Sequence, residues 1–228
     1  MSGVAGIIIG PDANWDLRNY HIYNSYAFLE GRHAIDIAPA QRQSYHNPTA
    51  GLPLYALMFA FNEHPRLVAA LMSLPYGIAI AAIAWLSSLV LPFSTMTEQV
   101  FRILAATVIG ATGAATLGVI GSTMNEIPIS TLIIFALAIT CARLKKDNLN
   151  YGALFAVGFC VGIAGGLKLT YAVHGLAIGC ALVSIVFLGK ISIRELLVSA
   201  LGVIVGLGLS SGWWFWHLYE LFGNPVFP

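Results

Sequence analysis

The chain has 228 residues, of which 58% are hydrophobic and 9% are charged, and its formal net charge is +1. Soluble domains carry about 25% charged residues, so this composition, with a mean hydropathy of +0.80, excludes an ordinary soluble fold. No basic run is present, and we expect no nucleic-acid partner. The three cysteines lie in apolar segments without metal-ligand spacing, so neither a disulfide framework nor a cysteine metal site is predicted.

The N-terminal region divides into a short apolar stretch and a polar segment. The stretch MSGVAGIIIG is too short to span a membrane and lacks the features of a signal peptide, so we interpret it as the end of a truncated first span. We expect the chain to be a fragment, or a minimal version, of a longer multi-span protein. Residues 12–48 then hold three of the four aspartates, three arginines, three histidines and four tyrosines, which predicts a functional surface.

A helix is predicted within this polar segment, from residue 14 to residue 30. The stretch contains no Gly or Pro, Gly31 is placed to end it, and Asp12 or Asn14 is placed to cap its start. On such a helix one face carries Asp16, Tyr20, Tyr23 and Ala27, while Trp15, Tyr26 and Phe28 are suited to the headgroup region. We therefore expect an amphipathic helix lying along the membrane surface.

Apolar runs occupy most of the remaining chain. Six of them are candidate spans: 67–92, 101–121, 128–142, 151–166, 171–189 and 196–216. Gly and Ala are dense in the second and fourth runs, as expected for helices that pack closely inside a bundle. The sequence predicts an all-α polytopic transmembrane bundle of about six spans over residues 66–228. It follows residues 1–65, which comprise the truncated first span and a long extracytoplasmic loop.

The distribution of Lys and Arg in the short loops predicts the orientation. Cations lie at Arg102, within 143–146 and within 190–194, and such loops are favoured in the cytoplasm. Alternation of the spans then places residues 12–65 on the opposite side. We expect an integral membrane protein whose first loop is extracytoplasmic.

Three ionisable residues have both a structural and a functional interpretation. Asp16 is either a carboxylate that complements the N-terminal end of a helix or a general base beside the membrane, and spacing does not separate these roles. Glu126 lies in a short turn before Pro128 and is either a solvated N-terminal carboxylate or a substrate contact. Lys168, within GGLKLT, either extends to the interface or takes part in function.

Histidines and aromatics are interpreted mainly as structural. His21, His33 and His46 match no compact metal-ligand pattern, so hydrogen-bonded histidines are favoured over a metal site. His174 lies in an apolar run and is either a helix–helix hydrogen-bond partner or a pathway residue. The cluster WWFWHLYE at 213–220 is expected to form an interfacial aromatic belt, with sugar stacking as the alternative.

Several strings resemble those of one enzyme family. WDLRNYHIYNSYAFLEGR and the following IDIAPAQRQSYHNP are similar to the first extracytoplasmic loop of bacterial membrane glycosyltransferases of the C-type superfamily, which use polyprenyl-phosphate sugars. GSTMNEIP, GLKLTYA and FGNPVFP are similar to positions in some members. The family's usual base is an acidic residue in the first loop, next to the first span. The resemblance therefore implies Asp16 as catalytic base, with Asp12 as the alternative.

The same resemblance implies a hexosyltransferase of the bacterial inner (plasma) membrane whose partners are a lipid-linked sugar donor and membrane lipids. The substrate-binding candidates, including cations for the departing phosphate, are Arg18, Tyr20, His21, Arg42, Glu126 and Lys168. No cofactor is required by this chemistry, and a divalent metal stays open. The alternative function is a transporter or channel with Lys168 and His174 on its pathway, and a scaffold is a third. The sequence does not indicate an oligomeric state.

Overall fold

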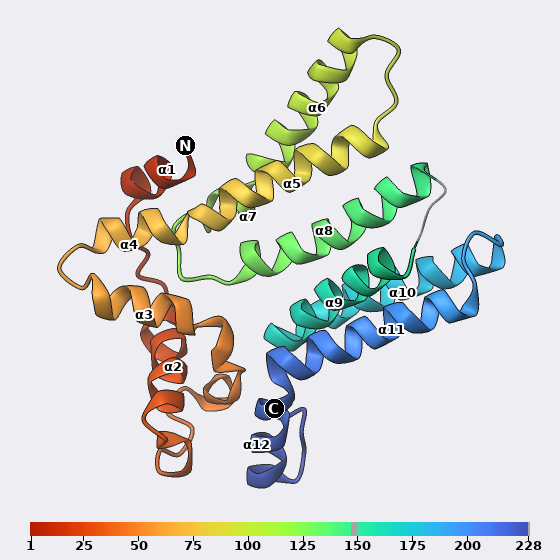
Figure 1. Ribbon diagram of the computed structural model, residues 1–228. Helices are drawn as coiled ribbons and strands as arrows, with labels where there is room; N and C mark the ends of the chain where they lie inside the picture. The colour runs from red at the N-terminus through yellow and green to blue at the C-terminus, as the bar shows by residue number, and fades with distance from the viewer. Residues whose placement is uncertain (147–149, 228) are drawn as a thin grey trace. The chain divides into compact units, whose positions relative to one another are not determined.

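The computed structural model describes residues 1–146 and 150–227 and is all-helical, with no strand in these ranges (Figure 1). The chain forms two compact units, each built from separate parts of the sequence. We call the first the loop unit, which comprises residues 1–77, 118–127 and 211–228. We call the second the bundle unit, which comprises residues 78–117 and 128–210. This division differs from the one expected at residue 65.

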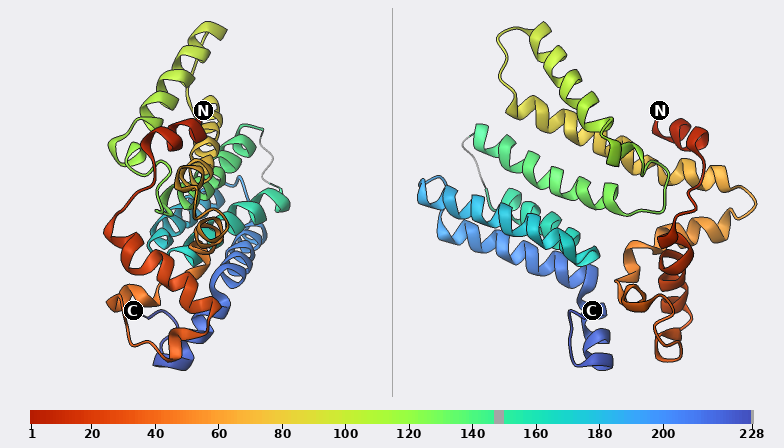
Figure 2. Two further views of the ribbon diagram at one scale, coloured as in Figure 1. Left: turned by 90° about the vertical axis from the view of Figure 1, so that its left-hand side faces the viewer. Right: turned by 180° about the vertical axis from the view of Figure 1, so that it is seen from behind.

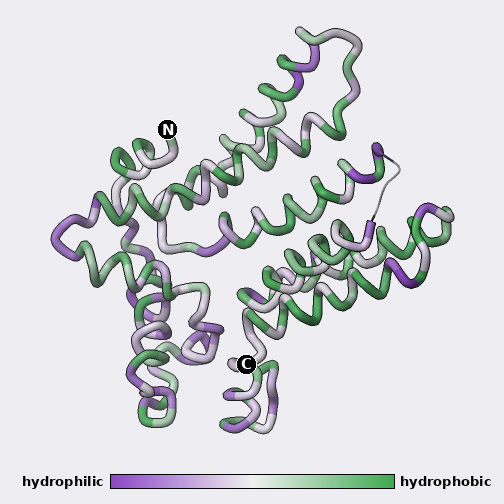
Figure 3. Tube along the Cα trace, viewed as in Figure 1, coloured by the Kyte–Doolittle hydropathy of each residue, from purple (hydrophilic) through white to green (hydrophobic). Residues whose placement is uncertain are grey.

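The loop unit consists of short helices joined by polar turns. Its elements are α1 (Ser2–Ile9), the π-helical η1 (Leu17–His21), α2 (Ile22–Leu29), the 3-10 turns η2 (Arg32–Ala34), η3 (Gln41–Tyr45) and η4 (Pro48–Ala50), α3 (Leu52–Ala60), α4 (Pro65–Met72) and α12 (Trp213–Phe222). Figure 3 shows that much of the hydrophilic sequence lies here and at the helix ends of the bundle unit.

The helix predicted over residues 14–30 is present from 15 to 29. The Leu17 backbone N–H donates to Asn14 Oδ1 at 2.7 Å, so Asn14 is the capping residue. At the other end Gly31 has a φ of 64°, a left-handed conformation that glycine adopts without steric cost. The position of this helix at a membrane surface stays a prediction.

The first part of this helix is π-helical, which the sequence did not indicate. A π segment closes i→i+5 hydrogen bonds and so shifts the register by which side chains share a face. Tyr20 interacts electrostatically with Asp16, whereas the Tyr23 hydroxyl donates to Asp36 Oδ2 at 2.9 Å. The two tyrosines of the expected face therefore interact with different aspartates.

Glycines bring three segments of the loop unit into backbone contact. A Cβ on Gly6 of α1 would lie 2.5 Å from the Ala69 carbonyl oxygen of α4, and one on Gly121 would lie 2.9 Å from the same atom. Gly121 also has a φ of 67°, which disfavours any residue with a side chain. This close approach sets residues 118–127 beside the start of the polar segment.

Helix α12 packs on the polar segment through its aromatic side chains. Trp214 is only 2% exposed, and its Nε1 donates to the Tyr45 carbonyl oxygen at 3.1 Å. Trp213 contacts Phe28 with ring centroids 4.6 Å apart. Trp216 is 63% exposed, as expected of an aromatic residue at a membrane interface. The expectation of an aromatic belt over 213–220 is therefore wrong for Trp214, which is a packing residue.

The bundle unit contains the longer apolar helices. Its elements are α5 (Leu74–Val90), which begins in the loop unit, α6 (Met96–Ala111), α7 (Ala114–Leu117), α8 (Glu126–Lys145), α9 (Tyr151–Leu167), η5 (Leu169–Tyr171), α10 (Ala172–Phe187), α11 (Ile193–Leu207) and the π-helical η6 (Gly208–Gly212), the last extending into the loop unit. Its apolar core is formed by α8, α9, η5, α10 and the start of α11.

Helices α9 and α11 pack in parallel with their backbones in contact, as Figure 2 illustrates. A Cβ on Gly158 would lie 1.9 Å from the Ser199 carbonyl oxygen, and one on Gly162 would lie 2.2 Å from that of Val203. Gly202 and Gly206 approach α9 in the same way. Small residues thus form a tight helix pair, as the Gly and Ala content of residues 152–166 predicted.

Four helical segments are long and apolar enough to cross a membrane, judged by length and composition within the described residues. They are Pro65–Val90, Glu126–Lys145, Leu169–Phe187 and Ile193–Phe222. Tyr151–Leu167 is an apolar helix of 17 residues, somewhat shorter than a typical span. The expected all-helical fold is confirmed, with four candidate spans among the described residues, whereas the expected count of about six spans stays a prediction.

The run 101–121 does not form a continuous span. Helix α6 ends at Ala111, the single turn α7 follows, and residues 118–125 are not helical. Gly113 follows the end of α6, and Gly121 adopts the left-handed conformation described above. A prediction from hydropathy depends on the apolar side chains of this run and takes no account of the backbone conformations that its glycines allow.

Candidate functional site

Asp12 and Thr123 form the central contact of the candidate site in the loop unit. Thr123 donates twice to the Asp12 carboxylate: its backbone N–H to Oδ1 and its hydroxyl to Oδ2, each at 3.1 Å. Asn14 Nδ2 also donates to Asp12 Oδ2. Three hydrogen bonds therefore hold this carboxylate between the polar segment and residues 118–127. We call this arrangement the Asp12–Thr123 lock.

His21 joins the same lock. Its Nδ1 lies 3.0 Å from Thr123 Oγ1. Because the single Thr123 hydroxyl proton is given to Asp12, His21 Nδ1 is the donor in this contact, and Nε2 of the neutral ring is then an acceptor. The lock thus selects one tautomer of His21.

Asp16 lies in the first turn of the helix, after the Asn14 cap, and acts electrostatically on Tyr20. Burial raises the pKa of Tyr20, and interaction with the Asp16 carboxylate and the Glu126 charge raise it further. The phenol is therefore held protonated next to Asp16. A carboxylate offers about four lone-pair sites, so Asp16 has the capacity to accept a proton donor.

Rings surround Tyr20 on several sides. The His21 and His46 rings meet it edge to face, with centroids 4.6 and 5.5 Å away, and Trp15 lies at 6.3 Å. Glu126, the first residue of α8, acts electrostatically on the same phenol. The structure therefore brings together five of the predicted site residues: Asp12, Asp16, Tyr20, His21 and Glu126.

The three predicted cations are placed differently. Arg18 and Arg42 are exposed in the loop unit and make no ion pair within the described part of the chain. Lys168 belongs to the bundle unit, where it stands in extended backbone between α9 and η5. His174 is also in the bundle unit, exposed and stacked on Tyr171 with centroids 5.3 Å apart. Only Arg18 and Arg42 belong to the same unit as Asp16.

Asp36, the third aspartate of the polar segment, binds Arg32 and Tyr23. Arg32 Nε and Nη2 donate to its two oxygens at 2.7 Å each, and Tyr23 adds a third hydrogen bond. The guanidinium holds the pKa of Asp36 below its usual range, while burial and the bond to Asp36 raise the pKa of Tyr23 to about 12. This group stabilises the turn after α2 rather than the Asp16 region.

A pair of histidines connects this turn to α12, and no sequence pattern indicates this pair. The rings of His33 and His217 have centroids 5.5 Å apart, and each also contacts Trp214. Both Nε2 atoms are buried without a hydrogen-bond partner among the described residues. Burial, and secondly the charge of His217, lower the pKa of His33 to about 4. His33 is therefore neutral at physiological pH.

Metal binding receives no geometric indication in the described residues. No group of three or more His, Cys, Asp or Glu side chains converges there in a way that would hold an ion. The expected structural role of His21 fits its bond to Thr123. The lock and the Asp16–Tyr20 pair therefore have to be explained through hydrogen bonds and charge.

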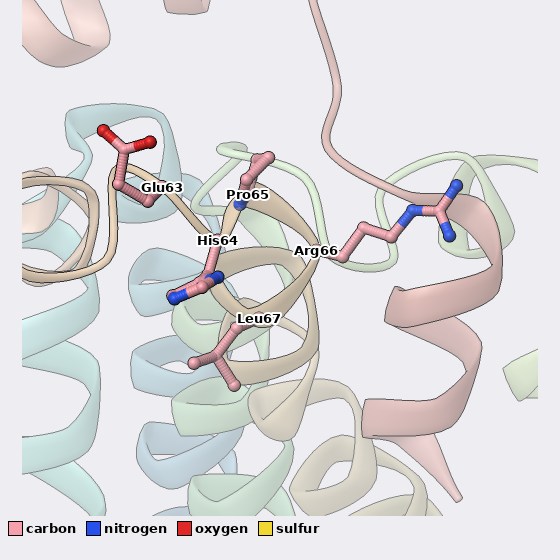
Figure 4. A pocket seen from close by; sticks show the side chains of 5 residues that line it. All are labelled: Glu63, His64, Pro65, Arg66 and Leu67. Atoms are coloured by element: carbon pink, nitrogen blue, oxygen red, sulfur yellow. The ribbon is translucent and has the colours of Figure 1, made fainter.

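A shallow cavity of about 600 Å³ lies at the α3–α4 turn, away from the residues discussed above. It is lined by Glu63, His64, Pro65, Arg66 and Leu67. Figure 4 shows the Glu63 and Arg66 side chains extending to opposite sides of the turn. Because its lining comes from five consecutive residues whose polar groups diverge, this cavity is an open surface hollow and we assign no site to it.

Comparison with known proteins gives no match to a protein-family model, to a curated protein or to a solved structure.

Proposed function

We propose that this chain belongs to a membrane glycosyltransferase that moves a sugar from a polyprenyl-phosphate donor to an acceptor hydroxyl, with Asp16 as general base. The observation that carries the proposal is the environment of Asp16. It lies at a capped helix start, it interacts electrostatically with the protonated phenol of Tyr20, and it is four residues from the Asp12–Thr123 lock. A base held in this way can take a proton without first being ordered.

The chemistry of the donor agrees with the composition of the chain. A polyprenyl tail stays in the hydrocarbon, so an enzyme for such a donor needs apolar spans together with a polar surface near their ends. Four helical segments supply the first, and residues 12–48 supply the second. Inner-membrane location with this surface outside the cytoplasm is part of the proposal, and the Lys and Arg of the short loops support the orientation.

The other site residues receive distinct roles in the proposal. Asp12 acts as a positioning residue, because its carboxylate is occupied by Thr123 and Asn14. Arg18 and Arg42 are the exposed cations that would neutralise charge on the departing phosphate, and arginine suits phosphate through its bidentate fork. Tyr20 interacts electrostatically with Asp16, while His21 and Glu126 complete its surroundings.

The experiment is sugar transfer by membranes that contain the full chain or its variants. Polyprenyl phosphates carrying radiolabelled glucose, mannose or galactose are the donors. Asp16→Asn is expected to lower the transfer rate by about 10²–10⁴-fold, the usual contribution of a general base. Asp12→Asn should lower it less, whereas Glu30→Gln, an exposed carboxylate of the same segment, should leave it unchanged. Equal rates for the parent and Asp16→Asn would remove Asp16 as the base.

A transporter or channel is the second candidate, and one observation favours it. Lys168 stands in extended backbone between two apolar helices, and interrupted helices carry the binding sites of many transporters. Solute flux that is lost in Lys168→Gln and kept in Asp16→Asn would support this function over sugar transfer.

A further inference from the structure

The helices of the bundle unit bring several connections to one end. The parallel packing of α9 on α11 sets their starting residues, Tyr151 and Ile193, at that end. Helix α8 ends shortly before the first of these residues, and α10 ends shortly before the second. Figures 1 and 2 show the end of α8 and the turn between α10 and α11 at the same end.

Cations from two distant parts of the sequence lie at this end. Lys145 and Lys146 are exposed at the end of α8, and Lys190 and Arg194 are exposed around the start of α11. Arg143 lies half-buried in the last turn of α8. We call these five residues the basic rim. Figure 3 shows both stretches as hydrophilic ends of otherwise apolar helices.

Within the described residues, the carboxylate next to Arg194 in sequence is hydrogen-bonded within the cap of its own helix. Glu195 is the acidic residue nearest in sequence to Arg194, and its carboxylate accepts from the Ser192 backbone N–H at 2.6 Å and from the Ser192 hydroxyl at 2.9 Å. It is therefore committed to capping α11. By contrast, Arg32 and Arg102 each pair with a carboxylate four residues away. Arg143, Lys145 and Arg194 make no such pair with any described residue.

Exposed apolar side chains adjoin the rim. Phe187 is 87% exposed, Leu188 75% and Ile193 67%, all within a few residues of Lys190. Leu197 continues the same helix with 62% exposure. This surface is complementary to an anionic lipid. The cations at the helix end suit the charged headgroup, and the exposed apolar side chains beside them suit the acyl chains.

We propose that the basic rim binds the headgroup of an anionic glycerophospholipid, whose acyl chains lie along Phe187, Ile193 and Leu197. Lys145, Lys146 and Lys190 attract the phosphate as point charges, and Arg194 adds bidentate hydrogen bonds. Each cation near a charged lipid surface contributes about a fivefold factor in affinity. This proposal is independent of the proposed sugar transfer, because it uses none of the residues around Asp16.

Native mass spectrometry of the purified full chain in detergent tests the proposal. The probes are phosphatidylglycerol, cardiolipin and phosphatidylcholine with matched acyl chains. The parent is expected to retain the two anionic lipids at least tenfold more strongly than phosphatidylcholine. The quadruple variant Lys145→Gln, Lys146→Gln, Lys190→Gln, Arg194→Gln should lose this preference. The matched variant Lys145→Arg, Lys146→Arg, Lys190→Arg keeps the charge and should retain it.

Two further arms make the outcome decisive. Single variants Lys145→Gln and Lys190→Gln should each lower the preference by about fivefold, so a quadruple variant that fails to fold does not decide the result. Soluble glycerol phosphate should not displace the lipid. Retention of all lipids to the same extent, an unchanged preference in the Gln variants, or displacement by glycerol phosphate would each overturn the proposal.

Discussion

Different kinds of contact stabilise the interior of the loop unit and the interior of the bundle unit. In the loop unit, distant segments are joined by side-chain hydrogen bonds, such as those of Thr123 to Asp12 and of Trp214 to the Tyr45 backbone, in addition to the backbone contacts of Gly6 and Gly121 with Ala69. In the bundle unit, α9 and α11 meet through glycines whose backbones touch. Polar contacts give the loop unit fixed positions for charged groups, whereas close backbone packing gives the bundle unit a rigid apolar body.

Substitutions at these two kinds of contact should therefore cost different amounts of folding free energy. A hydrogen-bonded contact loses a limited amount of free energy when one hydroxyl is removed, because the neighbouring atoms stay in place. A helix pair with touching backbones cannot admit even one added carbon without moving a whole helix.

The largest effect is expected at the α9–α11 contact. Gly162→Leu places a Cβ 2.2 Å from the Val203 carbonyl oxygen, and the backbone on both sides leaves it no space. We expect a loss of folding free energy of at least about 3 kcal/mol, at the upper end of overpacking costs. Thermal unfolding in detergent measures it. Gly165→Ala in the same helix is the control, because its Cβ would meet no atom within 4 Å, and a similar loss there would contradict this account.

An intermediate effect is expected at the Asp12–Thr123 lock. Thr123→Val keeps the shape of the side chain but removes the hydroxyl shared by Asp12 and His21, which should cost about 1–3 kcal/mol locally. Hydrogen exchange over residues 12–21 should become faster. Thr112→Val, at an exposed threonine of the bundle unit, should leave that exchange unchanged. Equal protection in Thr123→Val and the parent would show that the lock does not order this segment.

The smallest effect is expected at His33 and depends on pH. Its pKa is lowered in the folded protein to about 4, below the ordinary value of 6.5, so the folded state favours the neutral ring. The unfolded state therefore binds more protons between these values, and the stability of the α12 contact is complete above about pH 6.5 and falls towards pH 4. Trp214 fluorescence followed against pH measures this. The same pH profile in His33→Gln would rule out His33 as the group responsible.

The sequence predicted the local features of the polar segment better than its long-range contacts. The helix over residues 15–29 follows from the absence of Gly and Pro, from the Asn14 cap and from Gly31. The bond between Asp12 and Thr123 joins residues 111 positions apart, and neither residue type signals the other. The π segment likewise could not be predicted from the residue types, because it differs from an α-helix only in its hydrogen-bond register.

Hydropathy located the apolar segments but did not determine which of them form continuous helices. The runs around 128–142 and 171–189 correspond to helices of spanning length. The run 101–121 fails because backbone conformation at its glycines, and the approach of Gly121 to Ala69, override the apolar pattern. Trp214 shows that residue type alone does not reveal the role of an aromatic side chain, because tryptophan is found both in interfacial belts and in packing contacts.

A single-turnover measurement on Asp16→Asn tests the central claim most directly. Binding of a polyprenyl-phosphate sugar and its transfer to the acceptor are measured in the same membranes. If Asp16 is the base, binding should stay within a few-fold of the parent while the transfer step slows by at least about a hundredfold. An unchanged transfer step, or an equal loss of binding and transfer, would contradict the account.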